Sequence, residues 1–291
     1  MGIADLYDGD VSGVLEVIAL ADRKGIGQIS MGDHMGFAKS AHAARLVSHK
    51  FPYTLEYPWH EPISLLSAAA AITTQVRLST FVLIAPLRPT LLLAKQLATL
   101  DVISKGRVMV GLGVGWQEAE YRAAGMAFDT RFSDLEDMVG GMRALWGSAP
   151  ATFKGRSFGF EDFYAYPQPV QGRDLGVLFG LNPTSKNLDR MARLSQGWAM
   201  DPAYRPILAE RAKELRRLFA KYGRDPDKIE IHVGQRAIRT ADGSVDWAAV
   251  EAGAKESEAD GATTVSFRVS DFCRSREEIE GFFERVVSLG K

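Results

Sequence analysis

The sequence has almost no cysteine, no long apolar run and little excess charge of either sign. Its one cysteine, Cys273, cannot form an internal disulfide or a thiolate metal cluster, which fits a reducing compartment. The longest largely apolar stretch, Leu78–Leu87, is far shorter than the roughly 20 residues that span a bilayer. A formal net charge of −1 without basic blocks argues against nucleic acid or a membrane surface as the main partner.

The start of the chain also lacks a targeting pattern. Its first residues, MGIADLYDGD, are acidic and contain no apolar signal core, so we expect a cytoplasmic protein. The length of 291 residues would suit two average domains, although α/β barrels of about 250 residues form one. Because we find no linker or low-complexity tract, we expect a single domain over residues 1–291.

Short apolar runs alternate with helical patterns along the chain. These runs are apolar on both faces, as parallel strands covered by helices are. The expected strands are Ile3–Tyr7, Ile26–Met31, Val76–Ile84, Val108–Val114, Gly176–Leu181, Trp198–Met200, Ile229–Ile238 and Thr263–Val269. Eight such strands predict an α/β fold, a (β/α)8 TIM barrel with long insertions after strands two and four. A doubly wound sheet is the alternative, but no glycine fingerprint follows the first expected strand.

Helix starts and long connections complete this outline. Apolar stripes over 14–21, 135–145 and 279–287 predict helices, and the last two follow the capping-box patterns Ser133 to Glu136 and Ser275 to Glu278. The two insertions, 34–60 and 149–173, exceed ordinary loop length. Long loops of compact domains usually act as lids or binding loops.

Histidine is concentrated in the first insertion. His34, His42, His49 and His60 lie there, and their separations do not match paired metal ligands at i, i+3 or i, i+4. We therefore expect no metal site. Asp33 and His34 follow the second expected strand, at the barrel end where active sites lie. His34 could act as a general base or donate to a developing anion, and Asp33 could hold a backbone turn or a ring. The alternative is that Asp33 caps the loop and His34 only packs.

Two further strand ends and two carboxylates could carry function. Gly113 to Gly115 would let a flat ligand approach the backbone, although tight packing explains such glycines equally well. The segment 179–186 offers backbone N–H groups, hydroxyls and a lysine to a phosphate, with simple helix capping by Thr184 or Ser185 as the alternative. A helix start explains Glu61, and a solvated helix face explains Glu118.

Together these residues resemble the luciferase-like monooxygenase superfamily, whose members use FMN or the deazaflavin coenzyme F-420. The segments that carry the resemblance are 30–34, 61–66, 86–89, 95–101, 104–108, 111–116 and 192–198. The run Lys95–Asp101 is the most specific of them. The resemblance is close from about Gly25 to Trp198 and implies the same (β/α)8 barrel and a homodimer.

The resemblance also implies a set of site residues. The cofactor ring would lie over a bulge with a non-prolyl cis peptide, which matches Phe81-Val82, and Asp33 and His34 match the catalytic pair beside the ring. The implied cofactor-binding residues are Phe81, Val82, Gly113, Val114, Gly115, Gly180, Leu181, Asn182, Thr184 and Ser185.

The departures from the family pattern indicate the cofactor. Val114 stands where FMN-using luciferases often carry arginine, and Trp59 to Pro62 resembles the F-420 branch. Trp116 stands where sugar-phosphate dehydrogenases of that branch carry a catalytic glutamate, which argues against their reaction. We therefore expect an oxidoreductase that uses F-420 for hydride transfer to or from a small organic substrate. The alternatives are an FMNH2-dependent and oxygen-dependent monooxygenase, a non-catalytic flavin-binding protein and, least favoured, a metal-dependent hydrolase.

Overall fold

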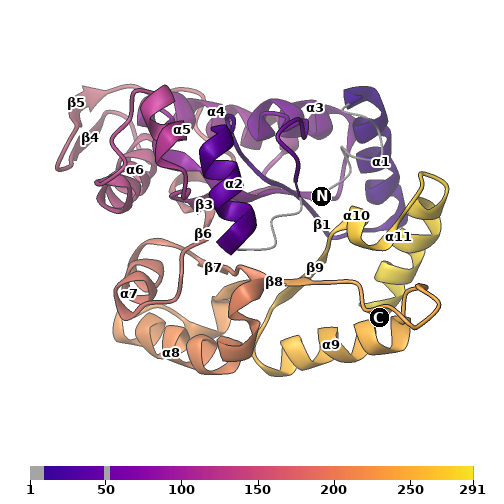
Figure 1. Cartoon of the computed structure of the whole chain (residues 1–291). Helices are drawn as coiled ribbons and strands as arrows, with labels where there is room; N and C mark the ends of the chain where they lie inside the picture. Colours follow the sequence, from indigo (N-terminus) through magenta and orange to yellow (C-terminus); the bar gives the residue numbers. More distant parts are fainter. Residues whose placement is uncertain (1–9, 49–52, 291) are drawn as a thin grey trace. The chain divides into compact units, whose positions relative to one another are not determined.

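The computed structural model describes residues 10–48 and 53–290. The chain divides into two compact units, one of Met1–Ile29 with Gly176–Lys291 and the other of Ser30–Leu175. Figure 1 shows that each of the two units contains strands and helices. The expected first strand, Ile3–Tyr7, and His49 lie outside the described residues. The single domain over residues 1–291 therefore stays a prediction.

The unit Ser30–Leu175 contains neighbouring strands in chain order. Strand β1 (Gln28–Met31) ends in this unit and lies next to β2 (Arg77–Ile84), which pairs in parallel with β3 (Val108–Gly113). Helices α3 (Pro62–Ile72) and α4 (Thr90–Ser104) pack against each other, and they cover β2 and β3 respectively. Every residue of β3 is buried, as the uninterrupted apolar run predicts.

The other unit repeats the same arrangement. Its strands are parallel and follow the chain in the order β6 (Gly176–Phe179), β7 (Gly197–Ala199), β8 (Glu230–Gln235) and β9 (Thr264–Phe267). The helices of the unit are α1 (Val11–Lys24), α7 (Ser185–Leu194), α8 (Leu208–Lys221), α9 (Trp247–Ala259), α10 (Val269–Phe272) and α11 (Glu278–Leu289). Helix α7 packs on α8, α9 packs on β8 and β9, and α1 packs on α11.

The expected parallel strands are thus present wherever the chain is described. Within each unit their order follows the chain without the reversal that marks a doubly wound sheet. The order is the one that a (β/α)8 barrel requires, because each crossover leads to the next strand. Closure into eight strands stays a prediction.

The two long segments expected as loops, 34–60 and 149–173, contain regular structure. Helix α2 (Lys39–Ser48) lies in the first, and the hairpin in the second was not predicted. In the second, β4 (Ala151–Lys154) and β5 (Gly159–Phe163) form an antiparallel hairpin. The ring of Phe153 lies 5.3 Å from that of Phe158 and 6.0 Å from that of Phe160, measured between centroids. The aromatic residues of this insertion therefore stabilise a hairpin through contacts across it.

Helix α6 (Arg131–Leu145) and α11 appear where the apolar stripes predict them, but the two capping boxes are wrong. Helix α6 begins at Arg131, and Ser133 lies inside it, where its hydroxyl donates to the carbonyl of Thr130. Ahead of α11, the carboxylate of Glu278 accepts from the backbone N–H of Arg274 at 2.7 Å. Competing local hydrogen bonds therefore replace both boxes.

The family-like run Lys95–Asp101 has a structural role on α4. Asp101 is fully buried and accepts hydrogen bonds from the backbone N–H of Gln171 at 3.0 Å and from its Nε2 at 2.7 Å. The run therefore ties the segment after the hairpin to the helix. Among the helices of the described residues, none combines the length and apolar character needed to cross a membrane.

Candidate active site

The carboxylate of Asp33 fixes the end of β1 to the end of β2. Its Oδ2 accepts from the backbone N–H of Ile84 at 2.8 Å and from Arg88 Nη1 at 2.7 Å, and its Oδ1 accepts from Arg88 Nη2 at 3.1 Å. Only 1% of the Asp33 side chain is exposed. The paired contact with a planar guanidinium sets the orientation of the carboxylate, which charge alone would not do.

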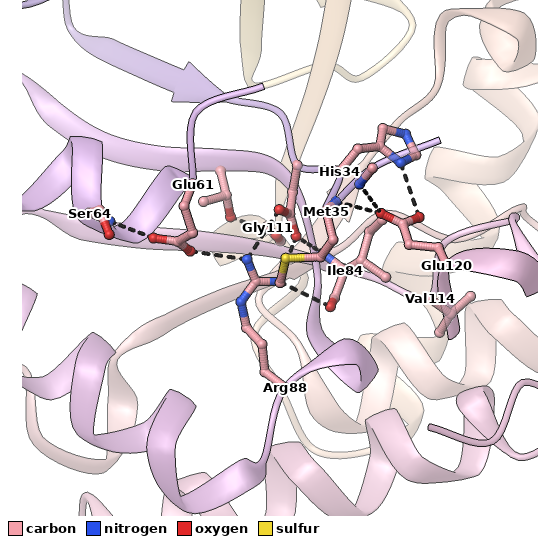
Figure 2. A network of polar contacts seen from close by, with 12 residues as sticks. His34, Met35, Glu61, Ser64, Ile84, Arg88, Gly111, Val114 and Glu120 are labelled. Atoms are coloured by element: carbon pink, nitrogen blue, oxygen red, sulfur yellow. Dashed lines mark hydrogen bonds and ion pairs between the residues drawn. The ribbon is translucent and has the colours of Figure 1, made fainter. Parts of the chain in front are cut away.

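Arg88 connects this strand end to a second carboxylate (Figure 2). Its Nη2 donates to Glu61 Oε1 at 3.0 Å, and the other oxygen of Glu61 caps α3 by accepting from the backbone N–H of Ser64 at 2.7 Å. Burial would raise the pKa of Glu61, but hydrogen bonds from Ser64 and Arg88 outweigh it and hold the pKa below its ordinary value. The explanation of Glu61 as a helix start is confirmed, and the ion pair with Arg88 adds to it.

These contacts bear on the role of Asp33. Both of its oxygens are occupied by Arg88 and Ile84. A carboxylate held in this way supports the adjacent turn, one of the two roles expected for it. Its catalytic role stays a prediction.

His34 follows Asp33 and lies among aromatic rings. The centroid of its imidazole is 4.5 Å from that of Phe37, 4.9 Å from that of Trp59 and 5.8 Å from that of Trp116. A Cβ added at Gly32 would lie 3.0 Å from the Trp59 ring, so a glycine at this position leaves room for the ring beside the strand end. His34 therefore has a largely apolar environment, with 9% of its side chain exposed.

A polar partner of His34 is Glu120, which the sequence reasoning missed. Nδ1 of His34 lies 3.2 Å from Glu120 Oε2, and 2% of the Glu120 side chain is exposed. The other oxygen, Oε1, accepts from the backbone N–H of Met35 (Figure 2) and from that of Gly36. Burial would raise the pKa of Glu120, but the hydrogen bond and electrostatic attraction of His34 and the hydrogen bond from Met35 leave it below its ordinary value.

Glu120 lies on the short helix α5 (Glu118–Ala123). Two neighbouring residues, Gln117 and Tyr121, form hydrogen bonds that connect this helix to other segments. Gln117, directly before it, donates to the carbonyl of Gly36 at 2.8 Å and accepts from the N–H of Ala38 at 2.7 Å. The buried Tyr121 hydroxyl donates to the carbonyl of Val114 at 2.7 Å, and burial raises its pKa. Helix α5 thus joins the loop after β1 to the end of β3.

The Phe81–Val82 peptide bond is cis, as predicted. It lies in a bulge of β2, where the pairing with β3 shifts between Thr80 and Leu83. Phe81 and Val82 are half-buried, whereas the residues on either side of them are buried. A Cβ at Gly111 would lie 2.3 Å from the carbonyl oxygen of Thr80, so the bulge requires glycine there. The contact of Phe81 and Val82 with a cofactor stays a prediction.

The glycines at the end of β3 are explained in part by packing. Gly115 has a φ of +59°, and a Cβ there would lie 2.9 Å from the side chain of Ile84. Gly113 ends the buried strand, and Val114 is 7% exposed. Packing accounts for Gly115, so cofactor contacts by Gly113, Val114 and Gly115 stay predictions.

The remaining predicted cofactor residues belong to the other unit, from the end of β6 to the first residue of α7. The Thr184 hydroxyl caps α7 by accepting from the N–H of Asn187 at 3.3 Å. The carbonyl of Asn182 accepts from Asn187 Nδ2 at 3.0 Å, and that of Leu181 accepts from Trp198 Nε1 at 3.0 Å. The capping alternative is confirmed for Thr184. The phosphate contact by Gly180, Leu181, Asn182, Thr184 and Ser185 stays a prediction.

A second histidine of the same long segment, His42, lies on α2. His42 is buried, and its Nε2 lies 2.8 Å from the carbonyl oxygen of Tyr53. Residues 10–48 and 53–290 contain no group of three or more His, Cys, Asp or Glu side chains that could hold a metal ion.

Comparisons with known proteins agree on the kind of protein. The family model described as luciferase-like monooxygenase matches residues 2–270. An uncharacterized protein of Mycobacterium tuberculosis, Rv0953c, is 33% identical over 84% of this chain and 79% of its own length. An FMNH2-dependent dimethylsulfone monooxygenase of Pseudomonas fluorescens is 32% identical over 38% of this chain and 31% of its own length.

Two solved structures show the same fold. The monooxygenase RslO1 from Streptomyces bottropensis has a TM-score of 0.77 at 21% identity, covering 97% of this chain and 94% of its own. An F-420-dependent secondary alcohol dehydrogenase, in complex with an F-420-acetone adduct, has a TM-score of 0.77 at 17% identity, covering 97% of this chain and 96% of its own. Since the two scores are equal, fold similarity does not decide which chemistry occurs.

Proposed function

Because the chain belongs to the luciferase-like monooxygenase family and is an oxidoreductase, we propose that it uses F-420 to transfer a hydride to or from a small organic substrate. The observation that carries the proposal is the placement of His34. It lies at the end of β1, held by Glu120, in the unit that contains the cis bulge of β2. A proton-exchanging imidazole and a shelf for a flat ring are the two elements that this reaction needs.

The residues of this unit fit a flavin-type ring. Phe81 and Val82 are half-buried in an otherwise buried stretch of β2. The absence of a side chain at Gly111 leaves room for the Thr80 carbonyl and so allows the bulge. Gly32, one residue before Asp33, lies against this bulge, since a Cβ there would be 3.9 Å from the Phe81 carbonyl oxygen. An apolar shelf beside a strand end that carries His34 is suited to the ring of either F-420 or FMN.

Bound F-420 would supply or accept the hydride. His34 would exchange the proton at the substrate atom that gains or loses negative charge, so hydride and proton together account for a two-electron reduction or oxidation. The rings of Phe37, Trp59 and Trp116 would exclude water from the imidazole. Asp33 and Arg88 would hold the strand end rigid.

Equilibrium binding separates the F-420 proposal from the FMN alternative. We expect the purified protein to bind F-420 at least about tenfold more tightly than FMN, a difference of about 1.4 kcal/mol. The reason is Val114, an uncharged residue where FMN-using luciferases often have an arginine for the phosphate. Fluorescence titration with each cofactor measures both dissociation constants. Tighter binding of FMN would favour the FMNH2-dependent monooxygenase instead.

Turnover tests the proposal against a non-catalytic flavin-binding protein. Small ketones and secondary alcohols form the first substrate panel, because a structural neighbour is a secondary alcohol dehydrogenase. Loss or gain of F-420 absorbance with any of them would support hydride transfer. Cofactor binding without turnover across a broad panel would favour the binding protein.

We further propose that two copies of the chain associate through α4. Its outer face exposes Leu91, Leu92, Val102 and Ile103, each to between 41% and 51%. Full burial of a leucine contributes roughly 1.5–3 kcal/mol, and each copy would bury the exposed half of its Leu92, so Leu92→Glu should weaken a dimer at least about tenfold. Light scattering over a dilution series measures this shift, with Leu46→Glu on α2, 50% exposed, as the control. A wild-type protein that is monomeric at high concentration would contradict the dimer.

A further inference from the structure

We propose that Glu120 is the positioning residue for His34, fixing its tautomer so that Nε2 is the nitrogen that exchanges the substrate proton. The catalytic importance of this arrangement rests on the proposed function, whereas the tautomer itself can be measured without cofactor or substrate. Nothing in the sequence pattern marked Glu120 out. The proposal follows from the contacts of its carboxylate.

The carboxylate of Glu120 determines which ring nitrogen of His34 carries a proton. An ionised carboxylate only accepts hydrogen bonds, and Glu120 Oε2 lies 3.2 Å from His34 Nδ1. Nδ1 must therefore be the donor. When the ring is neutral, its one proton is on Nδ1, and Nε2 has a lone pair that can take a proton from the substrate.

The second oxygen of Glu120 fixes the backbone that carries the imidazole. It accepts from the N–H groups of Met35 and Gly36, which directly follow His34. Gln117 holds the same loop by bonding the carbonyl of Gly36 and the N–H of Ala38. The side chain of His34 and the backbone directly after it are thus attached to one carboxylate, which restricts both the position and the rotation of the ring.

Because of its surroundings, the Glu120–His34 contact is electrostatically stronger than an ion pair at the protein surface. Glu120 is 2% and His34 is 9% exposed at the side chain, and aromatic rings flank the imidazole. In such an environment a charge on the imidazole is screened little by water. Glu120 would therefore stabilise His34 after it has accepted a proton, and it would draw the ring back to the same orientation after each cycle.

Nitrogen NMR of protein labelled with 15N in histidine tests the tautomer directly. The two ring nitrogens differ in chemical shift according to which one carries the proton, and the His34 signals are identified by their loss in His34→Gln. At a pH where the ring is neutral, we expect the wild-type protein to show the Nδ1–H form. Predominance of the Nε2–H form would overturn the proposal, and this result needs no variant of Glu120 to fold.

Glu120→Gln then tests whether Glu120 determines the tautomer of His34. The glutamine keeps the size of the side chain but has one accepting oxygen for the three donors of His34, Met35 and Gly36. We expect mixed tautomers and a turnover lowered at least about tenfold, with an unchanged dissociation constant for F-420. The matched control is Glu118→Gln on the same helix, whose carboxylate is 64% exposed and pairs with Arg122. It should leave tautomer and turnover unchanged.

The outcomes distinguish this proposal from the function on which it rests. An unchanged His34 tautomer in Glu120→Gln would show that Glu120 does not set it, whatever the cofactor. If the variant does not fold, Glu120→Asp, which retains the charge but withdraws it by one methylene, should likewise shift the His34 signals, and unaltered signals would count against the proposal. Failure to bind F-420 and FMN, with the Nδ1–H form present, would overturn the proposed function and leave the geometry standing.

Discussion

Replacing Arg88 with methionine is expected to lower the free energy of unfolding by about 3–5 kcal/mol, the range for removing one partner of a buried ion pair. The variant would leave Asp33, which is 1% exposed at the side chain, with the N–H of Ile84 as its remaining partner from this cluster. Methionine keeps the unbranched stem of the side chain. The decrease in the free energy of unfolding would therefore come mainly from the unpaired buried charge of Asp33 and not from a cavity. Urea denaturation followed by circular dichroism measures it.

The control is an arginine in an exposed ion pair. Arg122 and Glu118 are 75% and 64% exposed, so Arg122→Met should change stability by less than about 1 kcal/mol. Adding Asp33→Asn to Arg88→Met should recover part of the loss, because a neutral amide is cheaper to bury than an unpaired carboxylate. Equal effects of Arg88→Met and Arg122→Met would show that the ion pair does not hold the strand end.

The strands and the position of His34 could be predicted because they depend on local pattern. Apolar runs without alternation located the described parallel strands, and the rule that barrel active sites lie at the carboxyl ends of strands singled out Asp33 and His34. The cis peptide at Phe81-Val82 came from the family resemblance alone. No propensity of these two residues indicates a cis bond.

Glu120 was missed because its burial depends on distant segments. The sequence reasoning considered Glu118, and the structure confirms that this carboxylate lies on a solvated helix face. Helix α5 is too short to show a periodicity that would distinguish the two glutamates. The adjacent Tyr121, which is buried, is the one local signal that this part of the helix faces inward.

The cluster of Asp33, Glu61 and Arg88 could not be predicted from local sequence patterns for the same reason. Each residue appeared in a separate family-like segment, Asp33 and Glu61 had adequate local explanations, and Arg88 was not singled out. The structure brings them together through contacts that join β1 to the start of α3 and the segment after β2. Charged residues of opposite sign in separate motifs are a signal of pairing, but composition does not say which pairs form.

His34→Gln is expected to reduce turnover by roughly 10²–10⁴-fold, the usual contribution of a general acid or base. Glutamine can still donate to Glu120 and fill much of the space between Phe37 and Trp59, but its amide cannot exchange a proton near neutral pH. The dissociation constant for F-420 should change far less than turnover, because the proposed ring contacts at Phe81 and Val82 remain. Stopped-flow measurement of the hydride-transfer step, with titration of the cofactor, separates the two effects. Turnover within tenfold of the wild type, or a loss matched by weaker cofactor binding, would show that His34 packs in the site and exchanges no proton there.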